Sequence, residues 1–148
     1  MVQRADLSFL RGNRSVPTAT WLGHATYLVQ LDGLNILTDP HLSPRASPFG
    51  FAGPERLIPP AIDLANLPPI DVVLLSHDHY DHLDAPTLRA LAEAHDPTVI
   101  APLGHAALLA ALDCRSVTEL HWWAQHRRRG FSVTAVPVQH FSGRGLRD

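Results

Sequence analysis

The sequence has almost no cysteine: Cys114 is alone among 148 residues, so the chain can form no disulfide within itself. A single thiol fits a reducing compartment. Neither sign of charge dominates, because 12 basic residues face 14 acidic ones, and this balance gives no reason to expect a nucleic-acid partner. No apolar run is long enough to span a membrane, and residues 1–20 contain no apolar signal region. We therefore expect a cytoplasmic protein with one ordinary hydrophobic core.

Histidine, by contrast, is abundant, with 10 residues in the chain. Three of them lie in the segment SHDHYDHLD (76–84), directly after the apolar run IDVVLL. His77 and His79 are two positions apart in an extended segment, so both imidazoles can reach one cation. Asp81 and His82 follow in the next turn and can face a second cation. Imidazole nitrogen and carboxylate oxygen suit Zn²⁺ and related divalent ions.

The alternative for this segment is a polar loop whose histidines only cap and hydrogen-bond. Four candidate ligands in the order H-x-H-x-D-H, directly after a buried strand, argue against that alternative. A metal also needs a ligand from elsewhere in the chain. His140 follows the strand-like run VTAVPVQ just as His77 follows VVLLS, so we expect His140 to complete the first site.

Alternation of strand and helix patterns predicts an α/β layered domain over residues 18–148, preceded by a surface arm over residues 1–17. Asp84 is expected to cap a helix whose inner stripe contains Leu88, Leu91, Ala92 and His95. A second helix is expected over residues 104–112. The expected strands cover residues 18–22, 26–31, 34–39, 70–76, 98–101, 116–120 and 131–139.

Residues 40–70 contain eight prolines and two glycines, which predicts a long loop with a function. Residues 42–57, with Phe49 and Phe51, could line a lipid channel or form a packed lid. Trp122 and Trp123 are expected to pack in the core or at a sheet edge rather than to form a substrate platform. The run Arg127–Arg129 is expected to be a solvated turn.

Seven segments together resemble N-acylphosphatidylethanolamine-hydrolysing phospholipase D and its bacterial relatives, within the metallo-β-lactamase superfamily of two-metal hydrolases. The resemblance covers roughly residues 18–148. Its segments are, in order, TWLGHATYLV, ILTDP, SPRASPFGFAGPERL, LPPIDVVLLSHDHYDHLD, APLG, ELHWW and PVQHFSGRGLRD.

This resemblance implies an αββα sandwich in which His77, His79 and His140 bind one zinc ion, while Asp81 and His82 bind another. Asp39, in the TDP segment, matches a position that can orient a ligand histidine, although a turn-forming Asp before Pro40 is the alternative. His24, in the GHAT segment, is expected either near the site or as a structural histidine with satisfied hydrogen bonds.

The resemblance also implies a reaction. Two cations about 3.5–4 Å apart can share a bridging water and make hydroxide available near neutral pH, with Asp81 as a ligand and proton acceptor. The expected activity is hydrolysis of an N-acyl ethanolamine phospholipid or a related phosphodiester, with transient membrane contact. Hydrolysis of a sugar-phosphate lactone in the same fold is one alternative, and an inactive metal-binding fragment is another.

The sequence departs from the family pattern in one respect. No counterpart of the family's bridging aspartate or last zinc-binding histidine follows His140, so the resemblance implies only the N-terminal half of the fold. We therefore expect one tightly bound ion at His77, His79 and His140, and a weak second ion held by Asp81 and His82 alone. We also expect an uncovered sheet face that favours self-association, and no measurable hydrolase activity from residues 1–148 alone.

Overall fold

The computed structural model describes residues 5–128 and 130–145, and its centre is a six-stranded sheet with strands in the order in which they occur along the chain. The first three strands pair antiparallel with their neighbours. From the third strand to the sixth, neighbouring strands pair parallel, so the third strand takes part in both arrangements. Asp32 and Gly33 have φ of 49° and 81°, as in a two-residue turn that joins the strands of a hairpin. The strands are β1 (Thr18–Gly23), β2 (Thr26–Leu31), β3 (Leu34–Thr38), β4 (Val72–Leu74), β5 (Thr98–Pro102) and β6 (Ser116–Leu120).

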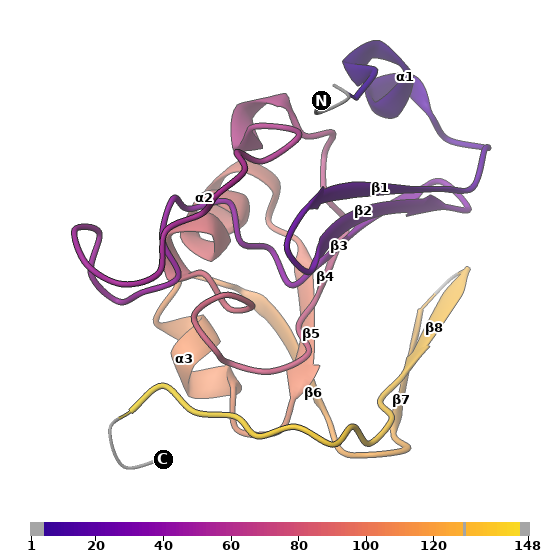
Figure 1. Cartoon of the computed structure of the whole chain (residues 1–148). Coiled ribbons are helices and arrows are strands. Elements are labelled where there is room, and N and C mark those ends of the chain that lie inside the picture. Colours follow the sequence, from indigo (N-terminus) through magenta and orange to yellow (C-terminus); the bar gives the residue numbers. More distant parts are fainter. Residues whose placement is uncertain (1–4, 129, 146–148) are drawn as a thin grey trace.

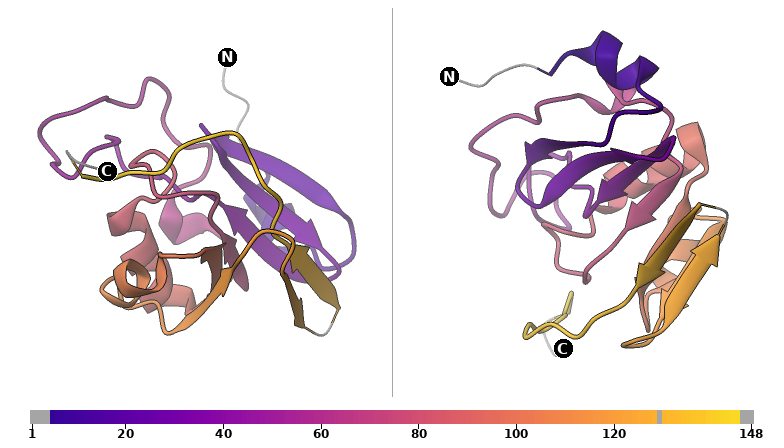
Figure 2. Two further views of the ribbon diagram at one scale, coloured as in Figure 1. Left: turned by 90° about the horizontal axis from the view of Figure 1, so that it is seen from below. Right: turned by 90° about the vertical axis from the view of Figure 1, so that its right-hand side faces the viewer.

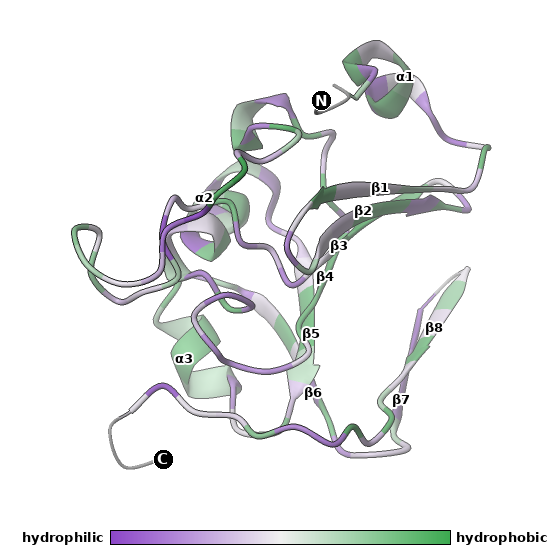
Figure 3. Ribbon diagram, in the orientation of Figure 1, coloured by the Kyte–Doolittle hydropathy of each residue, from purple (hydrophilic) through white to green (hydrophobic). Residues whose placement is uncertain are grey.

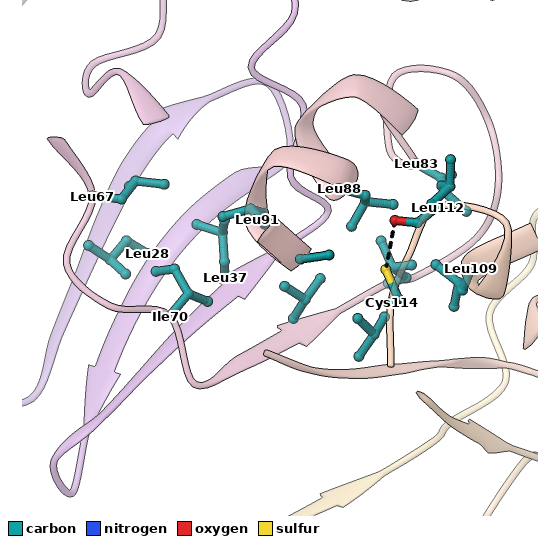
Figure 4. Packing of buried hydrophobic residues seen from close by; sticks show 14 of the residues in the cluster. Leu28, Leu37, Leu67, Ile70, Leu83, Leu88, Leu91, Leu109, Leu112 and Cys114 are labelled. Atoms are coloured by element: carbon teal, nitrogen blue, oxygen red, sulfur yellow. Dashed lines mark hydrogen bonds between the residues drawn. The ribbon is translucent and has the colours of Figure 1, made fainter. Parts of the chain in front are cut away.

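Helices α2 (Ala85–His95) and α3 (Ala106–Ala110) cover one face of this sheet, as Figure 1 shows. The main core fills the space between these helices and the sheet, where Leu28, Leu37 and Leu91 are fully buried (Figure 4). Figure 3 shows the apolar character of the central strands and of α3 that this packing uses. The helix predicted over residues 104–112 corresponds to α3, which is shorter than predicted.

The opposite face is covered over β4–β6 by a hairpin of β7 (Gln125–Arg128) and β8 (Phe131–Thr134). Phe131, Val133 and Ala135 pack there against a second cluster, formed by Val72, Ile100 and Leu120. The expectation that no later segment covers this face was therefore wrong for its β4–β6 part. Figure 1 and Figure 2 show the hairpin beside β6 and away from β1, and Trp21, Tyr27 and Leu31 of β1 and β2 are 50%, 42% and 44% exposed. The remainder of this face is therefore open.

The hairpin also corrects two local expectations. The last strand ends at Thr134 rather than at residue 139, and it pairs with a strand that the polar sequence QHRR did not suggest. Arg127 and Arg128 belong to that strand rather than to a turn, while Arg129 lies outside the described residues.

The segment expected as a surface arm contains the short helix α1 (Leu7–Gly12). The Asp6 carboxylate accepts hydrogen bonds from the backbone of Ser8 and Phe9 at 3.0 and 3.1 Å, which caps the helix. Leu10 is buried, and its carbonyl accepts a 2.7 Å hydrogen bond from Gln30 on β2. Sheet contacts therefore hold this segment on the domain. No helix within the described ranges is long and apolar enough to cross a bilayer.

Two pairs of aromatic side chains are exposed, one against expectation and one in a way that bears on its two alternatives. Trp122 and Trp123 are 60% and 68% exposed, so they pack neither in the core nor against a sheet edge. Trp123 has a φ of 68°, at a turn between β6 and β7 that directs its ring outward. Phe49 and Phe51 are 57% and 85% exposed on the proline-rich loop, with ring centroids 5.8 Å apart, which argues against a packed lid.

Candidate metal centre

The predicted ligands gather at the carboxyl ends of the parallel strands. β4 leads into the segment that carries His77, His79, Asp81 and His82, and β3 ends just before Asp39. His24 occupies the turn between β1 and β2 with a φ of 48°. His140 comes from the C-terminal segment, which runs past the lower end of β6 (Figure 1).

His77, His79 and His140 form the first group, with one nitrogen from each ring within 4.8 Å of the others. His77 Nε2 lies 2.9 Å from His79 Nδ1, and the His140 ring is 4.7 Å from the His77 ring centroid to centroid. Two imidazole nitrogens this close require a proton or a cation between them. The donor set therefore fits a divalent cation with nitrogen ligands.

His24, Asp81 and His82 form a second group with the same spacing. His24 Nε2 is 2.8 Å from Asp81 Oδ2, and His82 Nε2 is 3.7 Å from the same oxygen. The two groups adjoin, because the His77 and His82 ring centroids are 4.2 Å apart. The expectation of a weak second ion assumed two ligands, and the structure supplies His24 as a third candidate.

Asp39 determines which ring nitrogen carries the proton in one histidine of each group, His77 and His82. Its carboxylate accepts hydrogen bonds from the Ser76 amide and hydroxyl, both at 2.7 Å, and from His82 Nδ1 at 3.0 Å. Since the Ser76 hydroxyl donates to Asp39, its oxygen accepts from His77 Nδ1 at 2.8 Å. Both histidines are then protonated on Nδ1, which leaves each Nε2 lone pair free for a cation.

The charges around the site favour the same protonation states. Burial, and then the neighbouring His82, His79 and His140, lower the pKa of His77, so its imidazole is neutral at pH 7. Burial alone would raise the pKa of Asp81. A hydrogen bond from its own backbone, together with His82 and His24, outweighs burial and lowers that pKa, so Asp81 is a carboxylate.

Residues 142–144 form hydrogen bonds with the segment 76–84, and these contacts (called the clamp below) hold His140 near the candidate ligands of that segment. The Asp78 carboxylate accepts a 2.8 Å hydrogen bond from the Gly143 amide and one of 2.5 Å from the Ser142 hydroxyl. Arg144 donates to the carbonyls of Asp78 and Leu83 and lies 4.0 Å from the centre of the Tyr80 ring. Sequence reasoning missed this clamp, although the polar run FSGRG directly after His140 is a signal for it.

The Asp84 side chain does not cap α2, contrary to the prediction from the sequence. Asp84 occupies the N-cap position of α2, but its side chain makes no cap hydrogen bond. It accepts instead from the Ser43 amide and hydroxyl at 3.0 and 2.9 Å, which ties the proline-rich loop to the helix. The loop wall beside the metal centre is thereby fixed in place.

Comparison with known proteins gives the family. Residues 34–148 match the model of the beta-lactamase superfamily domain. The chain is 42% identical over 144 residues to the uncharacterized protein Rv0906 of Mycobacterium tuberculosis, covering 96% of this chain and 39% of that one. It is 41% identical over 141 residues to N-acyl-phosphatidylethanolamine-hydrolyzing phospholipase D 1 of Caenorhabditis elegans, covering 88% and 39%.

Among solved structures, the diiron beta-hydroxylase CmlA from Streptomyces venezuelae aligns with a TM-score of 0.62 at 26% identity, over 80% of this chain and 23% of that one. The chain therefore belongs to the beta-lactamase superfamily and has its mixed α/β fold, as the sequence predicted. The chain spans about two fifths of the length of the Mycobacterium tuberculosis and Caenorhabditis elegans relatives, since it covers 39% of each. This partial coverage fits the expectation of half a fold.

Proposed function

We propose that this chain carries the metal-binding part of a zinc-dependent phosphodiesterase that acts on N-acyl ethanolamine phospholipids or related phosphodiesters. The observation that carries the proposal is the contact between two three-residue ligand groups, joined by the 4.2 Å separation of the His77 and His82 rings. When bound, a pair of divalent ions supplies a Lewis acid for the phosphoryl oxygens and an activated water.

The chain's own residues have separate roles in this proposal. His77, His79 and His140 would hold one cation, and Asp81 with His82 and His24 the other. Asp81, as a carboxylate, would also serve as the proton acceptor. Asp39 would keep His77 and His82 in the tautomers that present Nε2 to the cations.

The choice of a phosphodiester rests on similarity to the phospholipase D of Caenorhabditis elegans, since fold and ligands alone do not select a substrate. The choice of zinc rests on ligands dominated by imidazole. Iron is the competing metal, because the aligned hydroxylase is a diiron protein. A lactonase and an inactive metal-binding fragment remain the other outcomes of the test.

The test loads the protein separately with zinc and with iron, then assays an N-acylphosphatidylethanolamine, bis(4-nitrophenyl) phosphate and a sugar-phosphate lactone. We expect phosphodiester hydrolysis with zinc only when the second half of the fold is present, and at least about a hundredfold loss of it in Asp81→Asn, which retains the shape of the side chain but not its charge. Lactone hydrolysis alone would select the first alternative. Tight metal binding without turnover of any substrate, even with the second half present, would select the inactive fragment.

We further propose transient membrane contact through the Phe49–Phe51 tip of the proline-rich loop, because both rings are exposed and contact each other. The double substitution Phe49→Ser, Phe51→Ser should then lower binding to phospholipid vesicles, measured by co-sedimentation. The matched control is Trp122→Ser, Trp123→Ser, which removes two equally exposed rings elsewhere. Equal binding of the wild type and the loop variant would reject the proposal.

A further inference from the structure

A cavity of about 590 Å³ opens beside the metal centre. His24, His79 and Asp81 form part of its lining, so any occupant lies next to the candidate ligands. Another part of the lining is apolar and includes Trp21, Leu57 and Ile58, which are 50%, 97% and 47% exposed. Apolar side chains left exposed around a concave site are typical of a surface that receives an apolar ligand group.

Arg56 is the cationic side chain in this lining, and neutral groups hold it in place. Its Nε donates to the Ser43 carbonyl at 3.3 Å. Its Nη2 donates to the His41 carbonyl and, at 2.9 Å, to His41 Nδ1. His41 Nε2 donates in turn to the Arg45 carbonyl at 3.3 Å, so the His41 ring is consistently the neutral tautomer with its proton on Nε2.

The charge of Arg56 is therefore not balanced by a carboxylate in direct contact. Across residues 5–128 and 130–145, the ion pairs join other residues, and Arg56 takes part in none of them. Glu55 also lines the cavity, but it is paired with Arg45 at 2.9 Å. Burial lowers the pKa of Arg56, and only the more distant charge of Asp84 opposes this. An anionic ligand would relieve the cost of burying this cation.

The position of Arg56 relative to the metal centre follows from Gly23. A Cβ atom on Gly23 would lie 2.6 Å from Arg56 Nη1, so the guanidinium rests against the backbone of the residue that precedes His24. Gly23 has a φ of 126°, which also requires glycine. The His24 and His41 ring centroids are 6.5 Å apart, so the groups form a row from Asp81 through His24 and His41 to Arg56.

We propose that Arg56 binds an anionic phosphoryl oxygen of an amphiphilic phosphate ester whose apolar group lies on Trp21, Leu57 and Ile58. Because Nε and Nη2 already donate to Ser43 and His41, the Nη1 protons are the ones available to a phosphate oxygen. A ligand without an ionised phosphate gives Arg56 no charge to neutralise, so this residue would select ligands that carry an anionic phosphate. The inference rests on the proposed function for the reacting group, but its test needs no turnover.

The test measures binding of octyl phosphate, methyl phosphate and 1-octanol by calorimetry, below the micelle concentration, with metal-free and zinc-loaded protein. We expect octyl phosphate to bind more tightly than either other ligand. Arg56→Gln should weaken octyl and methyl phosphate binding about tenfold or more and leave 1-octanol unchanged. Arg56→Lys keeps the charge but not the guanidinium that Ser43 and His41 hold in place, so its phosphate affinity should lie between those of the wild type and Arg56→Gln.

Arg89→Gln is the control, since it removes an equal charge from an exposed position on α2 outside this cavity. Circular dichroism and thermal unfolding verify that each variant is folded. If Arg56→Gln is unfolded, the comparison of Arg56→Lys with Arg89→Gln decides. Octyl phosphate affinity that is unchanged in the Arg56 variants, or lowered equally by Arg89→Gln, would overturn the inference. Arg56-dependent binding without hydrolysis, even with the second half of the fold present, would reject the proposed function alone.

Discussion

Replacing His79 with Ala is expected to abolish tight metal binding at the first ligand group. Loss of an outer-sphere partner of a metal site costs about 10–100-fold in affinity, and loss of a direct ligand should exceed the upper end of that range. His79 Nδ1 lies 2.9 Å from His77 Nε2, so its removal leaves His77 and the exposed His140 to hold the cation. Competition titration with a chromophoric chelator measures the change.

The control for this substitution is His121→Ala, which removes an exposed imidazole that belongs to neither ligand group. It should leave both stoichiometry and affinity unchanged. Cobalt substitution adds a spectroscopic measurement, because the visible absorption of Co²⁺ reports the number and geometry of its ligands. An unaltered affinity and spectrum in His79→Ala would remove His79 from the proposed ligand set. Stoichiometry near two in the wild type would support His24 as the third ligand of the second group.

Sequence patterns located most of the sheet and α2 because those elements are long enough to show their own periodicity. β2 alternates buried residues with exposed or half-buried ones from Thr26 to Leu31, and β4 lies within the apolar run IDVVLL. The β7–β8 hairpin was missed because the strand Gln125–Arg128 is polar throughout. Tertiary packing of Phe131 and Val133 on Val72 and Ile100 contributes to the stability of that hairpin, and a local pattern cannot reveal such contacts.

The candidate site likewise contains residues that a local sequence pattern predicts and residues that only tertiary contacts bring together. His77, His79, Asp81 and His82 were predictable as a set because one short segment carries them in a diagnostic order. The approach of Arg56 to His41 and Gly23 was not predictable, since it depends on how the proline-rich loop folds back over the β1–β2 turn. The role of Ser76 as a relay between Asp39 and His77 also required the actual hydrogen bonds.

The second large effect expected is self-association of residues 1–148 through the open part of the sheet, over β1–β3. Trp21, Tyr27 and Leu31 are 50%, 42% and 44% exposed there, and side chains on the same face of β3 are partly exposed as well. Strand register places Trp21 opposite Tyr27 and Leu31 opposite Leu34, so these residues form one continuous apolar surface. Soluble monomers rarely expose a contiguous apolar patch larger than a few hundred Å².

The double substitution Tyr27→Ser, Leu31→Ser should shift this equilibrium toward the monomer, with an association constant at least tenfold lower. Burying one large apolar side chain contributes about 1.5–3 kcal/mol, and about 1.4 kcal/mol corresponds to a factor of ten. Phe9→Ser, Leu103→Ser is the control, because it removes two residues of similar exposure from outside this surface. Sedimentation velocity over a range of concentrations measures the association, and metal titration verifies that the site is intact. A wild-type chain that remains monomeric at every concentration would contradict self-association, and an equal shift in both variants would assign it to another surface.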